Sequence, residues 1–225
     1  MNTTVEEAKT LVQDLKARVH DVTNVEVVVC PPFVSLVPVA ELLQGSNIGL
    51  GAQNMYWEKS GAYTGEIAGS MLTSAGCTFV IIGHSERRAY FNETDETVNK
   101  RIFAALDEGL QPIVCVGETL EEREKGETVD VIKRQVIQGL ANLSVEQMKR
   151  VVVAYEPVWA IGTGKTATPD QAQEVHAFIR KLLGEMFDEA TAAATRIQYG
   201  GSVKPANVTE LMNQADIDGR HCQAW

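Results

Sequence analysis

The sequence predicts an α/β fold in which a parallel sheet is covered by helices. Six largely apolar runs, beginning near residues 25, 47, 78, 111, 151 and 196, have the composition of buried strands. Each run is followed by a segment with helical periodicity, so that β and α alternate along the chain. This alternation is compatible with an open doubly wound sheet or with a (β/α)8 barrel.

The first half of the chain begins with a helix. Thr4 and Glu7 have the spacing of a capping box, and apolar residues then recur on one face. The next strand ends at two prolines, and the helix after it ends at Gly45. The expected elements are a helix at 4–20, a strand at 25–30, a helix at 33–43, a strand at 47–53 and a short helix near 66–74.

The second half continues the same alternation. Its strongest helix start is Thr168-Pro169-Asp170-Gln171, which combines a capping box with proline at the first helical position. The expected elements are strands at 78–83, 111–117, 151–156 and 196–202, and helices at about 98–110, 119–140, 144–147, 168–187 and 205–212.

Composition indicates a cytoplasmic protein of one large domain or two small ones. The 225 residues carry 30 acidic and 20 basic side chains, and the net charge of -10 opposes binding to nucleic acid. No apolar run has membrane-spanning length, so no membrane association is expected. The four cysteines lack C-x-x-C spacing and are expected to be free thiols in a reducing compartment.

Candidate catalytic residues stand where strands end. Glu156 follows an apolar strand, precedes a proline and a glycine-containing loop, and is either a general base or a structural acid. His84 follows another apolar strand and is either a structural residue or the partner of Glu156 in moving a proton between adjacent carbons. His20 and His176 lie within predicted helices and are expected on the surface.

Two glycine-containing segments are candidate phosphate sites. Residues 161–166 resemble a P-loop, but Trp159 stands where that motif needs its first glycine, so nucleotide binding is not favoured. Gly200-Gly201-Ser202 precedes the last predicted helix, whose N-terminus favours an anion; a plain tight turn explains the glycines equally well.

Four motifs together resemble the triosephosphate isomerase family. They are residues 156–165 (EPVWAIGTGK), 83–88 (GHSERR), 115–118 (CVGE) and 199–203 (YGGSV), in family order and spacing from Met1 to about Gly219. The resemblance implies a TIM barrel that interconverts dihydroxyacetone phosphate and glyceraldehyde 3-phosphate in glycolysis and gluconeogenesis. It also implies a cytoplasmic homodimer that needs neither cofactor nor metal.

The same resemblance implies residue roles. Glu156 matches the base and His84 the residue that hydrogen-bonds the enediolate, with Glu86 an acid beside them. The phosphate-binding groups are then Gly162 of the loop after Glu156, together with Gly200, Gly201 and Ser202. Residues 53–65 match the dimer loop, with Thr64 at the tip that reaches the neighbouring subunit.

The chain departs from the family pattern at both ends. It begins at the Met-Asn that follows the family's first strand, which carries an asparagine and a lysine of the site, and residues 220–225 do not resemble the family's last strand and helix. We therefore expect a truncated barrel domain over residues 1–219 with six strands, the first and eighth missing, and an unrelated tail. Low isomerase activity is expected; the alternative is a non-catalytic isoform that pairs with a full-length subunit.

Overall fold

The computed structural model describes residues 1–161 and 166–221. These residues form two compact units, described here one at a time. Of the described residues, the first comprises 1–82 and 103–112, and the second 83–102, 113–161 and 166–221. Helix α5 (Asp95–Asp107) and strand β4 (Gln111–Val116) each continue from one unit into the other. The single domain ending at residue 219 stays a prediction.

The first unit begins with the expected helix. In α1 (Val5–Val19) the Thr4 hydroxyl accepts from Glu7 N and the Glu7 carboxylate accepts from Thr4 N, so the predicted capping box is confirmed. The remaining complete elements of this unit are β1 (Val27–Val29), the 3-10 turn η1 (Phe33–Ser35), α2 (Leu36–Leu43), β2 (Ile48–Ala52), α3 (Gly69–Ser74) and β3 (Phe79–Ile82).

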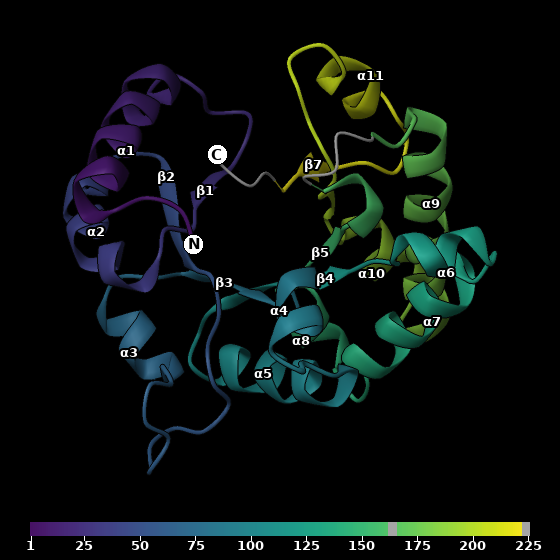
Figure 1. Cartoon of the computed structure of the whole chain (residues 1–225), viewed down its shortest axis with the longest axis horizontal. Coiled ribbons are helices and arrows are strands. Elements are labelled where there is room, and N and C mark those ends of the chain that lie inside the picture. Colours follow the sequence, from purple (N-terminus) through teal and green to yellow (C-terminus); the bar gives the residue numbers. More distant parts are fainter. Residues whose placement is uncertain (162–165, 222–225) are drawn as a thin grey trace. The chain divides into compact units, whose positions relative to one another are not determined.

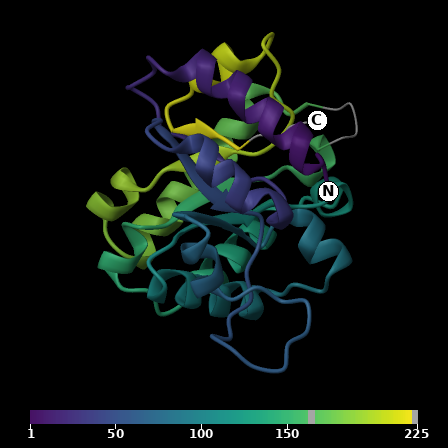
Figure 2. The ribbon, with the colours of Figure 1, turned by 90° about the vertical axis from the view of Figure 1, so that its left-hand side faces the viewer.

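Helices α1 and α2 pack together beside the strands of the first unit (Figure 1; Figure 2). Parallel ladders join β1 to β2 and β2 to β3. Between β2 and α3 the chain forms a long loop, visible in blue at the bottom of Figure 2. Within this loop the rings of Tyr56 and Trp57 lie 4.0 Å apart between centroids, and those of Tyr56 and Tyr63 lie 4.9 Å apart. These aromatic contacts give the loop internal packing.

The second unit carries the remaining elements (Figure 1). They are α4 (Ser85–Tyr90), α6 (Leu120–Glu124), α7 (Thr128–Gly139), α8 (Val145–Met148), β5 (Val152–Tyr155), the 3-10 turn η2 (Val158–Ala160), α9 (Pro169–Met186), α10 (Glu189–Ala194), β6 (Ile197–Tyr199), α11 (Val208–Met212) and β7 (Gly219–Arg220). Parallel ladders join β4 to β5, β5 to β6 and β6 to β7. Strands β4 and β5 are almost wholly buried.

The described residues contain seven strands in sequence order, so the expected count of six is wrong. The additional strand, β7, pairs Gly219 with Gln198 and Arg220 with Tyr199. The prediction counts the six strands as the second to the seventh of an eight-stranded barrel. Strand β7 follows them and so takes the place of the eighth. Ladder bonds use backbone groups, which a change of side chains leaves in place. The absence of the first and eighth strands is therefore not confirmed.

Several helix boundaries also differ from prediction. The helix expected at 119–140 is two helices, α6 and α7, because Gly126 takes a positive φ of 77° just after α6. Helices α4 and α10 were not predicted, and α10 is capped by Asp188, whose carboxylate accepts from Thr191 N. Helix α11 begins at Val208, three residues after the predicted start. Among the described residues, no helix is long and apolar enough to cross a bilayer.

Candidate active site

Glu156 lies one residue beyond the buried strand β5. Its N–H donates to Val116 O at 2.8 Å, which extends the β4–β5 ladder, and its side chain is 2% exposed. Glycines on the neighbouring strands make room for it. A Cβ at Gly117 would lie 1.8 Å from Glu156 O, and one at Gly200 would lie 2.8 Å from Glu156 Cγ. The backbone of Glu156 thus requires glycine at position 117.

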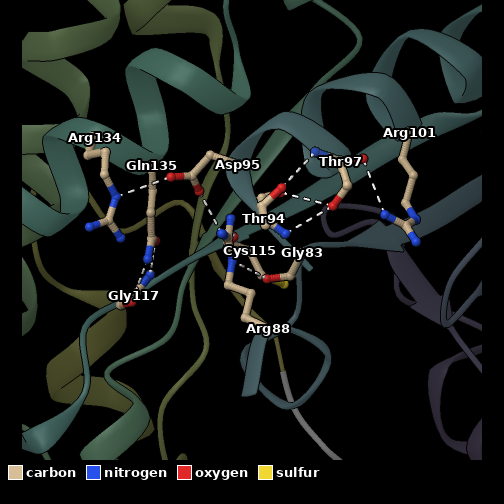
Figure 3. A network of polar contacts seen from close by, with 10 residues as sticks. All are labelled: Gly83, Arg88, Thr94, Asp95, Thr97, Arg101, Cys115, Gly117, Arg134 and Gln135. Carbon is tan, nitrogen blue, oxygen red and sulfur yellow. Dashed lines mark hydrogen bonds and ion pairs between the residues drawn. The ribbon is translucent and has the colours of Figure 1, made fainter. Parts of the chain in front are cut away.

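His84 is held between a turn and a helix. Gly83 has a φ of 73°, and helix α4 begins directly after His84. Arg88 of this helix donates from Nε to Gly83 O at 2.8 Å, from Nη1 to Asp95 at 2.6 Å and from Nη2 to Cys115 O at 3.4 Å (Figure 3). A single guanidinium therefore ties the turn before His84 to the start of α5 and to the end of β4.

A second contact in Figure 3 fixes the end of β4. The Gln135 amide of α7 accepts from Gly117 N at 2.8 Å and donates to Gly117 O at 3.1 Å. Both backbone groups of Gly117 are thereby satisfied next to Glu156, where water would otherwise be needed.

The two candidate side chains meet in the second unit. His84 Nε2 lies 2.9 Å from Glu156 Oε1, and Ser85 N donates to Glu156 Oε2 at 2.9 Å. Glu86 N donates to His84 Nδ1 at 3.2 Å, so Nδ1 presents its lone pair and the ring proton lies on Nε2, facing the carboxylate. The pair is buried, as water exclusion around a proton transfer requires.

Burial and hydrogen bonding act in opposite directions on this pair. Burial raises the pKa of Glu156, but the hydrogen bond and charge of His84 and the Ser85 N–H outweigh it, and the pKa lies below the usual value. Burial lowers the pKa of His84, but the hydrogen bond and charge of Glu156 together have the larger effect, so the pKa lies above its usual value. The Glu86 N–H opposes protonation at Nδ1, because an imidazolium has no lone pair there. Glu156 is therefore an ionised carboxylate near neutral pH.

Glu118 supports the segment that follows Glu156. It is fully buried, and its Oε1 accepts from Trp159 Nε1 at 2.9 Å, from Arg123 Nη1 at 3.0 Å and from Tyr155 Oη at 3.1 Å. Val158 N also donates to Glu118 O at 3.1 Å. Glu118 thus holds Tyr155 and Trp159, the aromatic residues before and after Glu156.

Comparison with known proteins assigns this arrangement to a family. A profile of triosephosphate isomerase matches residues 1–221. The chain belongs to the triosephosphate isomerase family. It is 61% identical over 219 residues to the triosephosphate isomerase of Moorella thermoacetica and 58% identical to that of Endomicrobium trichonymphae, covering 97% of this chain and 87% of each relative. It is 59% identical over 213 residues to that of Carboxydothermus hydrogenoformans, covering 95% of this chain and 85% of the relative.

These comparisons confirm the resemblance stated from the motifs, and with it an isomerase in an α/β TIM fold. The alternative of a truncated, non-catalytic isoform finds no support, because relatives carrying the isomerase name align with nearly the whole chain.

The glycine turn expected to bind phosphate lies beside the pair. Gly200 N donates to Tyr155 O at 2.7 Å, and a Cβ at Gly201 would fall 2.2 Å from Tyr199 Oη, so glycine is needed there for packing. Ser202 N donates to Ala160 O at 3.2 Å. Because α11 begins only at Val208, the helix N-terminus expected directly after this turn is farther along the chain.

The other predicted site residues are Glu86, Thr64 and Gly162. Glu86 stands in the first turn of α4, with its side chain 55% exposed and Oε2 3.8 Å from His84 Nδ1. Gly162 lies outside the described residues. Thr64 is an exposed residue of the loop between β2 and α3, in the first unit.

Sequence reasoning missed two groups at the isomerase site. The Ser85 N–H that holds Glu156 is a backbone group, and only its place at the start of α4 could have indicated it. His221 was assigned to a tail unlike the family, yet its ring centroid lies 6.2 Å from that of His84. The strand β7, which carries the chain there, was not predicted, so no signal in the sequence indicated His221.

Proposed function

We propose that this chain interconverts dihydroxyacetone phosphate and D-glyceraldehyde 3-phosphate, with Glu156 as the base and His84 as the hydrogen-bond donor to the substrate oxygens. The observation that carries the proposal is the buried contact of 2.9 Å between His84 Nε2 and Glu156 Oε1. It joins an ionised carboxylate to a ring nitrogen that bears a proton. Triosephosphate isomerases are the standard illustration of a glutamate paired with a neutral imidazole, and the roles proposed here follow that family pattern.

The reaction needs a proton to move between adjacent carbons. Glu156 takes a proton from the carbon next to the carbonyl and becomes a carboxylic acid, while the two bonding electrons form the enediolate. His84 donates a hydrogen bond from Nε2 to the enediolate oxygens, which stabilises their charge in a buried site. Glu156 then returns the proton to the neighbouring carbon, while the hydroxyl proton on the first oxygen passes to the second oxygen by way of His84, so that the carbonyl forms on the first carbon. To reach the substrate carbon, Glu156 gives up its contact with His84 or with Ser85 N, because these contacts occupy both of its oxygens.

The remaining assignments follow from the family resemblance. We propose that Gly162 and Gly201 contact the substrate phosphate through backbone N–H groups and Ser202 through its hydroxyl, that Gly200 lines the phosphate site, and that Glu86 borders the site. Thr64 then belongs to the contact surface of a cytoplasmic homodimer. Light scattering of the purified chain at several concentrations tests this state, and a mass of one chain throughout would contradict it.

The isomerase proposal is tested by a coupled assay with glyceraldehyde 3-phosphate. Glu156→Asp moves the carboxylate back by one methylene, and removal of effective general-base catalysis typically lowers kcat by about 10²–10⁴-fold. His84→Gln is expected to lower it as well, because the proton on Nε2 is lost. Glu174→Gln, an exposed position on α9, is the matched control and should leave the rate unchanged. Equal rates for Glu156→Asp and the unaltered chain would refute the proposal.

A further inference from the structure

His221 stands beside the proposed catalytic pair. It follows β7, and its N–H donates to Tyr199 O at 2.9 Å, which extends the β6–β7 ladder by one residue. The rings of His84 and His221 are inclined at 58° to each other. One ligand atom each from His84, Glu156 and His221 lie within 4.8 Å of one another. Two imidazoles and one carboxylate thus converge on one place in the second unit.

We propose that His84, Glu156 and His221 form a binding site for Zn²⁺. Two histidines and one glutamate are an established zinc ligand set that leaves a fourth position for water. With metal–ligand distances of about 2.1 Å, a tetrahedral site separates its ligands by about 3.4 Å. The observed separations, from 2.9 Å between His84 Nε2 and Glu156 Oε1 up to the 4.8 Å limit, bracket this value. Small rotations of the side chains are sufficient to reach it.

The ligand types favour zinc over the hard divalent cations. Mg²⁺ and Ca²⁺ prefer shells of oxygen ligands, and this site offers one carboxylate and two imidazole nitrogens. Glu156 and His84 are buried, whereas His221 is only partly buried. The two buried ligands already lie next to each other, and the ion reaches them past the partly exposed ring of His221.

Zinc binding redistributes one proton. The neutral His84 ring carries its proton on Nε2, the nitrogen that faces Glu156. When Nε2 binds zinc, this proton moves to Nδ1 through solvent, and the hydrogen bond from Glu86 N to Nδ1 is lost. The Glu86 carboxylate, with Oε2 3.8 Å from Nδ1, then becomes the acceptor for that proton. A carboxylate behind a metal-bound histidine is a common second layer of zinc sites.

Zinc and isomerisation then exclude each other, because both use His84 Nε2 and Glu156. This consequence rests on the proposed function, whereas zinc binding itself does not. Binding is therefore measured directly, so that failure of the zinc site and failure of the isomerase assignment are distinguishable.

The experiment is calorimetric titration of the full chain, first stripped of metal with a chelator, with zinc alone and with magnesium alone. We expect one zinc per chain, no magnesium binding, and at least about tenfold weaker zinc binding in His221→Gln. His20→Gln is the matched control, because His20 is an exposed histidine of the first unit. Cys222→Ser tests whether the neighbouring thiol is the ligand instead.

A second measurement on the unaltered chain avoids dependence on how the variants fold. Zinc should shift the NMR signals of two of the four histidine rings, and His20→Gln should remove a signal that does not shift. The proposal is overturned if His221→Gln binds zinc as tightly as the unaltered chain, if Cys222→Ser alone abolishes binding, or if the His84 and His221 rings do not respond to zinc.

Discussion

His176 makes the stability of the second unit depend on pH. Although it was expected on the surface, it is fully buried in α9, where its Nδ1 lies 3.1 Å from Asp216 O. Its ring lies 5.7 Å from that of Tyr155 and 6.3 Å from that of Tyr199, between centroids. Nδ1–H donates to the carbonyl, and burial keeps the ring neutral. Burial lowers the pKa of His176 to about 4, against the opposing effect of the Asp216 carbonyl.

The size and sign of the effect follow from linkage. The usual pKa is 6.5 and the folded value about 4, so the unfolded chain binds a proton at a higher pH than the folded chain does. Stability from the neutral ring is fully present above pH 6.5 and is lost as the pH falls toward 4. The difference between these two pKa values corresponds to about 3 kcal/mol in total, of which about 2 kcal/mol is lost between pH 7.5 and pH 5.

Urea denaturation of the full chain at pH 7.5, 6 and 5 measures this loss. The carboxylates also titrate in this range, so the informative quantity is the difference between the unaltered chain and His176→Gln, which lacks an ionisable ring. This difference should change by about 2 kcal/mol between pH 7.5 and 5. His20→Gln, at an exposed position, should retain the slope of the unaltered chain. A difference that stays constant with pH would refute the reasoning.

Other substitutions test how the site is held in place. Gly117→Ala should destabilise the chain by about 1–3 kcal/mol in urea denaturation, because its Cβ would overlap Glu156 O. Gly139→Ala is the control and should not destabilise the chain, since its Cβ would lie 3.6 Å from Val98. Equal stabilities of the two variants would contradict this packing. Arg88→Met should cost about 1–3 kcal/mol, because the mostly buried Asp95 loses one of its two guanidinium contacts and keeps the other. The double variant Arg88→Met with Asp95→Asn should recover part of the lost stability. If it does not, the charge pairing of Arg88 with Asp95 is not the cause. Because the pKa of Glu156 lies below its usual value, protonation of Glu156 should not limit kcat/KM above pH 5. A fall in kcat/KM below about pH 6 that disappears in Glu156→Asp would contradict this lowered pKa.

Local signals predicted most of the fold. The capping boxes at Thr4 and Thr168 each need only residues within one helical turn, and both are present in α1 and α9. The buried strands were equally readable, because β-branched runs followed by helical periodicity have few other solutions. Helix α10 was missed because Glu189–Ala194 is alanine-rich and short, with little amphipathic pattern to detect.

The site was only partly predictable, because its side chains meet through the tertiary fold. Glu156 and His84 were selected since parallel strands end at one edge of a sheet, and the structure brings their reactive atoms to 2.9 Å. Arg88 was not selected, although it fixes the turn before His84, because its three acceptors belong to segments that no local pattern relates. His176 was misassigned for a related reason, since helical periodicity does not reveal that the Asp216 carbonyl covers one face of α9.

At the end of the described chain, strand β7 is held by backbone hydrogen bonds and not by its side chains. The motif comparison predicted that the family pattern ends at Gly219, whereas the family profile matches residues up to 221. The strand forms nevertheless, because Asp218 N and His221 N donate to the carbonyls of Ile197 and Tyr199 whatever their own side chains are. The backbone path of β7 brings the imidazole of His221 close to Glu156 and His84. Since the ladder does not depend on this side chain, a different residue at position 221 should leave the strand in place.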